Sequence, residues 1–135
     1  MREALETPVL ADECIFSAAD VLRCINEGAA DMVNIKVLKC GGLLASLEME
    51  GIARAGGLGV VVGSMIEAGV GSLLSAHFAA AAPAAFSAEL CGPLLFTDDL
   101  LDRPLRISDG DLQLDDAPGL GAGLDSERLE RYRVG

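Results

Sequence analysis

The chain alternates short apolar runs with longer segments of helical spacing, and this alternation restricts its possible folds more than any other feature. The runs recur at intervals of roughly 25 residues, each too short for a helix and rich in aliphatic side chains. Apolar strands that alternate with helices predict βα units and a parallel sheet buried on both faces. The candidate strands are residues 8–12, 32–38, 58–63 and 86–90.

Three segments between these runs carry the end signals of helices. Ser17, with Asp20 three residues later, predicts a helix start, and Gly28 predicts its end. The paired glycines at 41–42 and 56–57 mark helix starts and stops and lack the spacing of a phosphate-binding loop. The second and third helices are expected at 43–55 and 71–82, with Pro83 closing the third and His77 packing within it.

Beyond the fourth run the composition changes, and a tail is expected. Residues 98–116 are rich in acids, and two alternating runs flank an Asp-Gly pair at 109–110 that favours a β-hairpin. Asp125 is the expected N-cap of a short helix near the C-terminus. The predicted division is a βα part over residues 1–94 and a tail over residues 95–135 that lacks the bulk of a domain.

Composition excludes several classes of partner. The 135 residues are 51% apolar, enough for one core, and carry a net charge of −11, so no nucleic-acid partner is expected. No signal peptide or bilayer-spanning stretch is visible, so no membrane partner is expected either. The four cysteines form no Cys-x-x-Cys pair and are expected to be reduced, which favours a cytoplasmic protein.

Three charged residues fall at or near the ends of the predicted strands. Asp12 ends the first strand, Lys36 lies in the second and Glu89 lies in the fourth. In parallel α/β folds the carboxyl ends of the strands build the active site, where such a set could bind a divalent cation and move a proton. The alternative is a buried Lys–Asp or Lys–Glu pair that only sets the strand register.

Four blocks of sequence, in order and spacing, resemble the enolase superfamily over nearly the whole chain. The branch is that of mandelate racemase and the muconate-lactonizing enzymes, with dipeptide epimerases and o-succinylbenzoate synthases as relatives. The Lys-x-x-Lys-x-Gly-Gly and Glu-Leu-x-Gly-Pro forms are most similar to muconate cycloisomerases. The blocks are Pro8-Val-Leu-Ala-Asp12-Glu13, Asn34-Ile-Lys36-Val-Leu-Lys39-Cys-Gly41-Gly42, Gly63-Ser-Met65-Ile-Glu67-Ala-Gly69-Val-Gly71 and Ser87-Ala-Glu89-Leu-Cys-Gly92-Pro93-Leu-Leu.

The resemblance implies the second half of a (β/α)8 TIM barrel, with the four strands as strands five to eight. It implies that Asp12 is a metal-binding carboxylate and that Glu13 orients its neighbours. It implies that Lys36 faces the substrate, as acid/base or as a cation beside an enolate, and that Glu89 is a carboxylate near the substrate. Glu67 matches a common glutamate of the loop after strand seven; the alternative is a charge that faces solvent or a neighbouring loop.

The implied chemistry is proton transfer next to a carboxylate, with Mg²⁺ or Mn²⁺ as cofactor and a small carboxylate as substrate. Cations stabilise the enediolate, and a nearby cation with burial would lower the pKa of the lysine toward neutrality. Cycloisomerisation of a muconate-like dicarboxylate is the expected parent reaction. The alternatives are a dipeptide epimerase, an N-acylamino acid racemase or an o-succinylbenzoate synthase.

Other expectations follow from what the resemblance leaves unmatched. No residue matches the family's first two metal ligands, its Lys-x-Lys motif or its capping domain, against which the tail would pack. The isolated chain is expected to be inactive, because one carboxylate does not hold Mg²⁺ against water. Open sheet edges favour a homo-oligomer or association with a missing N-terminal half. A non-catalytic truncated structural module is the alternative from another class.

Overall fold

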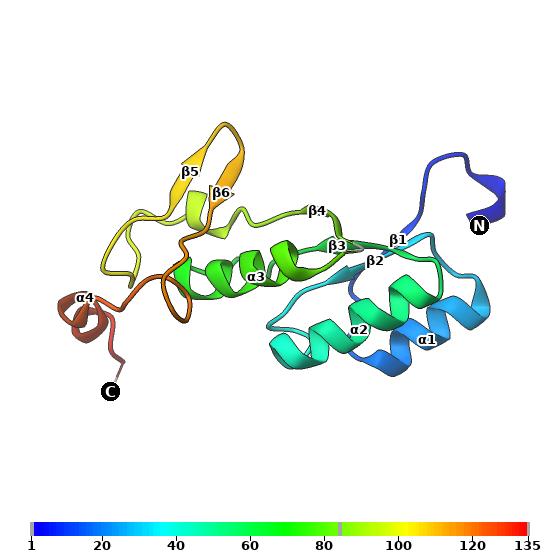
Figure 1. Ribbon diagram of the computed structural model, residues 1–135, viewed down its shortest axis with the longest axis horizontal. Helices are drawn as coiled ribbons and strands as arrows, with labels where there is room; N and C mark the ends of the chain where they lie inside the picture. Colours follow the sequence, from blue (N-terminus) through cyan, green and yellow to red (C-terminus); the bar gives the residue numbers. More distant parts are fainter. Residues whose placement is uncertain (1, 84, 135) are drawn as a thin grey trace.

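The structure has the alternation of strands and helices that the sequence predicts (Figure 1). It is a computed structural model and describes residues 2–83 and 85–134. The first part contains the 3-10 turn η1 (Arg2–Ala4), β1 (Leu10–Ala11), α1 (Ala18–Glu27), β2 (Met32–Ile35), α2 (Leu43–Ala55), β3 (Gly59–Val62), α3 (Gly69–Ala81) and β4 (Ala85–Ala88). The tail contains η2 (Gly92–Leu94), β5 (Arg106–Ser108), β6 (Asp111–Gln113) and α4 (Ser126–Arg131).

The first four strands form one parallel sheet in the order β1-β2-β3-β4. Each strand is shorter than predicted, so Lys36 and Glu89 lie directly after β2 and β4 and not within them. After β2 the backbone turns, because the Cys40 N–H donates to Lys36 O and the Gly42 N–H donates to Val37 O. Those groups are therefore lost to the sheet ladder, and the charged residue stands at the strand's end.

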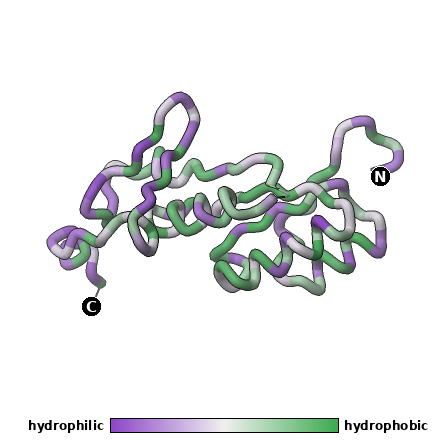
Figure 2. The backbone as a smooth tube through the Cα atoms, viewed as in Figure 1, coloured by the Kyte–Doolittle hydropathy of each residue, from purple (hydrophilic) through white to green (hydrophobic). Residues whose placement is uncertain are grey.

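The core lies between the sheet and the helices on one of its sides. Residues of β2 and β3 that alternate along the strands, such as Val33 and Val60, are fully buried with Phe78 of α3. By the same alternation, Asn34 and Val61 belong to the opposite face of the sheet. Figure 2 shows that apolar residues are concentrated along the strands and α3, whereas the residues of the hairpin tip and α4 are mostly hydrophilic.

Local signals set most helix ends where the sequence places them. The Ser17 side chain accepts the Asp20 N–H at the start of α1, and Gly28 ends α1 in the left-handed conformation at φ 57°. The start of α3 differs, since it begins at Gly69, two residues before the prediction. The reason is tertiary, because the Asp99 carboxylate from the tail accepts the Gly69 N–H at 2.7 Å.

The tail packs back against α3. The hairpin of β5 and β6 turns at Asp109-Gly110, where both residues have positive φ, as the sequence predicts. Leu101 of the tail is 2% exposed. Nε2 of His77, in α3, lies 3.4 Å from the backbone oxygen of Leu120. The tail therefore contacts α3 directly, and its packing on a capping domain remains a prediction.

Two further properties concern the cysteines and the helices. All four cysteines, Cys14, Cys24, Cys40 and Cys91, are free thiols. In the part of the chain that the structure describes, no helix has the length and apolar character needed to cross a bilayer.

Asp31 makes the fold sensitive to acid. Its carboxylate accepts the Val9 N–H at 2.8 Å and the Arg2 Nε–H at 2.6 Å, and these bonds hold its pKa below the ordinary 3.8. The pKa of Asp31 is lower in the folded chain than in the unfolded chain. Its stabilisation is therefore complete at pH values above its pKa in the unfolded chain, and is lost as the pH falls through its pKa in the folded chain. The free energy of unfolding of wild type, measured by urea titration, should fall more steeply below about pH 4 than that of Asp31→Asn. Parallel curves would contradict this prediction.

Candidate functional site

Asp12, Glu13 and Lys36 come together at the carboxyl ends of β1 and β2. The two strands are parallel neighbours, so the residues that follow them lie at the same edge of the sheet. Lys36 Nζ lies 2.9 Å from Asp12 Oδ1 and 2.5 Å from Glu13 Oε1. The structure thus joins three of the five residues that the sequence singles out.

The electrostatics of this cluster keep all three groups charged. The hydrogen bond to Glu13 raises the pKa of Lys36; burial opposes this, and Asp12 adds to it. Partial burial works against ionisation of Asp12, but hydrogen bonds from Lys36 and Asn34 outweigh it and lower the pKa of Asp12. The Lys36 hydrogen bond also lowers the pKa of Glu13. In this chain the pKa of Lys36 is raised, because two carboxylates lie within hydrogen-bond distance of its ammonium. The expected fall of that pKa toward neutrality requires a nearby cation and remains a prediction for a complete barrel.

Lys39 belongs to the same cluster, although sequence reasoning assigned it no role. Its Nζ donates to Asp12 O at 2.9 Å and lies 3.4 Å from Asp12 Oδ1 and 3.5 Å from Glu13 Oε2. The ammonium also stands 5.2 Å from the centre of the Phe16 ring, and its side chain is 3% exposed. The Lys-x-x-Lys spacing carried the signal, because the turn after β2 brings the second lysine to the same carboxylates that the first contacts.

Asn34 supports the cluster from β2, two residues before Lys36. It is buried, its side chain hydrogen bonds to Asp12, and its Oδ1 has no partner among the described residues. A Cβ on Gly63 would stand 2.4 Å from that Oδ1, so glycine is needed after β3 to admit the amide. Sequence reasoning did not single out Asn34, because a lone asparagine in a strand is no signal by itself.

Glu67 stands apart from the cluster, in the loop after β3. Its side chain is buried, and neither carboxylate oxygen has a hydrogen-bond partner among the described residues. Its own carbonyl accepts the Ser72 hydroxyl at 3.1 Å, and a Cβ on Gly92 would overlap that carbonyl. Burial of Glu67 contradicts a charge that faces solvent. The other part of that alternative, a charge against a neighbouring loop, and a role near the substrate both remain predictions.

Backbone strain marks the residue before Glu67. Ile66 has φ 62°, a left-handed conformation that costs a β-branched residue about 1–2 kcal/mol, and its side chain is 55% exposed. Asparagine tolerates this conformation. Ile66→Asn should raise the free energy of unfolding by about 0.5–1 kcal/mol in urea titrations, because relief of strain exceeds the small loss of packing. Met65→Asn, whose parent residue is similarly exposed without positive φ, is the control; an equal gain there would contradict the explanation.

Glu89 directly follows β4 but does not join the Asp12–Lys36 cluster. It is exposed, its N–H donates to Val62 O at 2.8 Å, and it lines a pocket of about 550 Å³ between α3 and the hairpin. β2 and β3 separate β1 from β4, which places the two strand ends about 14 Å apart. One four-stranded sheet therefore does not bring Glu89 to Asp12.

The described residues do not by themselves fit a Mg²⁺ site. Among them, no three His, Cys, Asp or Glu side chains group closely enough to hold a metal ion. The Asp12 carboxylate instead contacts the ammonium groups of Lys36 and Lys39. Mg²⁺ demands six oxygens in octahedral geometry, and Asp12 can supply only one side chain toward such a set.

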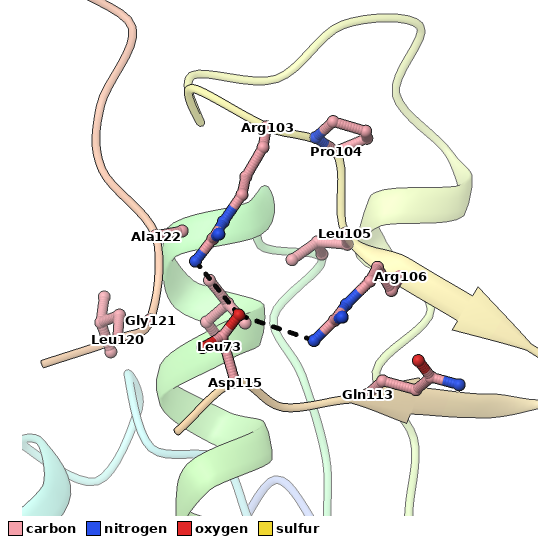
Figure 3. Close-up of a pocket in the computed structure, with 10 residues that line it drawn as sticks. All are labelled: Leu73, Arg103, Pro104, Leu105, Arg106, Gln113, Asp115, Leu120, Gly121 and Ala122. Atoms are coloured by element: carbon pink, nitrogen blue, oxygen red, sulfur yellow. Dashed lines mark ion pairs between the residues drawn. The ribbon is translucent and has the colours of Figure 1, made fainter. Parts of the chain in front are cut away.

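A second polar feature lies in the tail, where a pocket of about 270 Å³ opens beside α3 (Figure 3). Arg103 and Arg106 both point at Asp115, with N···O distances of 3.5 and 3.7 Å. All three side chains are substantially exposed, so these ion pairs contribute little to stability. The pocket lies between the hairpin and the loop before α4, and no residue of the Asp12–Lys36 cluster lines it.

Comparison with known proteins finds one matching family model and relatives whose names include cycloisomerases and racemases. The family model described as enolase C-terminal domain-like matches residues 1–128. Muconate cycloisomerase 1 of Rhodococcus opacus is 39% identical over 133 residues, which cover 98% of this chain and 36% of that protein. N-succinyl-L-Arg/Lys racemase of Bacillus cereus is 34% identical over 99% of this chain and 36% of its own length.

Solved structures agree with the sequence comparison. The muconate lactonizing enzyme of Pseudomonas fluorescens, complexed with muconolactone, aligns with a TM-score of 0.94 at 40% identity over 98% of this chain and 36% of its own. The chain thus spans about a third of the length of the relatives it matches. Its parallel α/β sheet is half of their (β/α) barrel, as the sequence predicts. The chain belongs to the enolase C-terminal domain-like family.

Proposed function

We propose that this chain supplies part of the active site of an enolase-superfamily enzyme that transfers a proton at the carbon next to a substrate carboxylate. The observation that carries the proposal is the buried Lys36 ammonium, held at the carboxyl ends of two parallel strands by Asp12 and Glu13. Active sites of barrels lie at this end. The muconate cycloisomerase relatives support a muconate-like dicarboxylate as substrate and a lactone as product.

Lys36 is suited to act as an acid or as a cation in this reaction. Its neighbours keep Nζ protonated, so it can donate a proton to the carbon beside the carboxylate or hold the negative charge of an enolate. Glu13 positions Lys36 by direct contact with its ammonium, and Lys39 helps to position both carboxylates, because its Nζ contacts Asp12 and Glu13. In a complete barrel we propose that Asp12 contributes one ligand to Mg²⁺ or Mn²⁺, with the others supplied from outside this chain.

The test is a chimera in which this chain replaces the aligned third of the Pseudomonas fluorescens enzyme. We expect the chimera to convert muconate to muconolactone, and Lys36→Met to lower its kcat by about 10²–10⁴-fold. Arg23→Met, which removes an exposed cation from α1, is the matched control and should leave the rate unchanged. Turnover of N-succinyl amino acids or dipeptides in place of muconate would favour the racemase or epimerase alternative. A folded chimera inactive on all of them would reject the proposal.

The 135-residue chain by itself is expected to be inactive. The described residues provide one carboxylate for the metal and one acid/base lysine, and neither suffices without the rest of a barrel. Purified chain with muconate and millimolar Mg²⁺ should give no lactone above the rate without protein, whereas a muconate cycloisomerase assayed in parallel should. Mg²⁺-dependent turnover by the chain alone would contradict this prediction.

Free thiols favour a cytoplasmic location, and no nucleic-acid or membrane partner is proposed.

A further inference from the structure

Asn34 of β2 is a buried amide that stands directly beside the Asp12 carboxylate. The parallel register pairs Ala11 with Val33, and one residue further along both strands it sets Asp12 level with Asn34. The side-chain amide of Asn34 hydrogen bonds to that carboxylate. The same carboxylate contacts the ammonium of Lys36. Asn34 is therefore one step removed from the residue that carries the proposed reaction.

The hydrogen bond to Asp12 fixes which way the Asn34 amide points. An ionised carboxylate only accepts hydrogen bonds, so the amide donates to it through Nδ2. The Oδ1 atom of Asn34 is then the one that is buried without a partner among the described residues. A buried acceptor without a partner costs free energy, so stability alone does not explain this amide. Residues kept at such a cost usually serve a functional site.

Gly63, directly after β3, leaves the space that the Asn34 amide occupies. Its N–H donates to Ile35 O at 3.1 Å, which keeps Gly63 beside β2. A Cβ on Gly63 would stand 2.4 Å from Asn34 Oδ1 and 2.7 Å from Asn34 Nδ2, closer than such atoms approach. Gly63 has no positive φ, so the fit to the amide, and not the backbone conformation, requires glycine here. Two neighbouring strands are thus shaped around one amide.

We propose that Asn34, in the space that Gly63 leaves for it, is a positioning residue for the reaction of Lys36. The amide holds the Asp12 carboxylate, and Asp12 Oδ1 in turn lies 2.9 Å from Lys36 Nζ. Because the amide fixes the orientation of the carboxylate, it also fixes the position of the ammonium. Such placement matters, since a misplacement of about 1 Å can cost about 100-fold in rate. The role in the reaction rests on the proposed function, whereas the coupling of Asn34 to Lys36 does not.

The first test uses the lysine ammonium signals in ¹H–¹⁵N spectra of the 135-residue chain, whose two lysines are Lys36 and Lys39. Both side chains are buried, which slows the exchange of their protons with water. Asn34→Leu keeps the size and removes the donor, so it should shift the Lys36 signal or broaden it by faster exchange. Asn26→Leu, at an exposed asparagine of α1, is the matched control and should leave both signals in place. An unchanged Lys36 signal in folded Asn34→Leu would overturn the proposal.

Gly63→Ala tests the same arrangement without changing Asn34 itself. The added Cβ should push the amide away from Asp12 and so reproduce the change of the Lys36 signal. In an Asn34→Ala chain the amide is absent, and Gly63→Ala should then have no further effect on that signal. A change of equal size with and without the amide would overturn the proposal. This pair of measurements also decides the proposal if Asn34→Leu does not fold.

The second test measures rates in the chimera with the Pseudomonas fluorescens enzyme. Asn34→Leu should lower its kcat by about 10–100-fold and change its KM by less than about two-fold, because the ammonium acts on the charge that develops during the reaction. In a Lys36→Met chimera the same substitution should have no further effect, whereas a merely structural defect would lower the residual rate too.

The outcomes separate this inference from the proposed function. An unchanged kcat in Asn34→Leu, or an equal loss with and without Lys36, would overturn the positioning role. A folded chimera that is inactive with Lys36 intact would instead reject the proposed function. The ammonium signals would then still decide whether Asn34 positions Lys36.

Discussion

Replacing Gly92 with alanine should be among the most damaging single changes in this chain, with a loss of about 3 kcal/mol or more in the free energy of unfolding. A Cβ at this position would overlap the main-chain carbonyl of Glu67, within 2.0 Å of the oxygen. The obstacle is backbone, so no rotamer relieves it; either the loop after β3 or the turn η2 must move. Urea titration at one fixed protein concentration measures the loss.

The same substitution elsewhere provides the control. Gly51 lies inside α2, and a Cβ there would meet nothing within 4 Å. Gly51→Ala should therefore raise the free energy of unfolding by about 0.5–1 kcal/mol, since alanine is the better helix former. Equal effects of the two substitutions, in either direction, would show that the contact with Glu67 is not what makes Gly92 necessary.

Replacing Glu67 with methionine should stabilise the chain by about 1–3 kcal/mol, because a buried polar group without a partner costs that amount. Both of its carboxylate oxygens are buried and unpartnered among the described residues. Methionine has a similar length and needs no hydrogen bond. Glu67→Gln should lie between wild type and methionine, because it removes the charge and keeps a buried amide. Chemical denaturation at fixed protein concentration is the measurement.

Glu89→Met is the matched control for Glu67. Glu89 is exposed, so its substitution should change the free energy of unfolding by less than about 0.5 kcal/mol.

If Glu67→Met lowered the free energy of unfolding instead, the Glu67 carboxylate would have a favourable partner, and its burial would not be a cost. A gain would mean that the charge is kept against stability, as functional residues often are.

Sequence patterns predicted the elements of this fold because their causes are local. Ser17 and Asp20 sit within one helical turn, and the positive φ of Asp109-Gly110 follows from those two residues. The apolar strands were expected for the same reason, although their ends were not. Lys36 falls outside β2 because the turn that follows captures its carbonyl, a competition that periodicity does not show.

The candidate site was predictable in part, and the limit is set by topology. Parallel neighbours end at one edge, which is why Asp12 and Lys36 could be grouped from their positions at the end of one predicted strand and within the next, whereas Glu13 was expected only from the family resemblance. Glu89 follows a strand in the same way, yet β4 is the far edge of the sheet. The order of the strands in a sheet, and so the number of strands between the ends of β1 and β4, is not determined by the residues of either strand.

By itself, then, the sequence determined the alternation of strands and helices, the caps, the hairpin turn and the motifs that place the chain in its family. Tertiary structure alone decided that Asp99 from the tail starts α3 at Gly69, that Lys39 folds back onto Asp12 and that Glu67 is buried. The first set depends on residues a few positions apart, whose contacts form within one turn or strand. The second depends on segments far apart in sequence, whose meeting is fixed only when the sheet, its helices and the tail pack together.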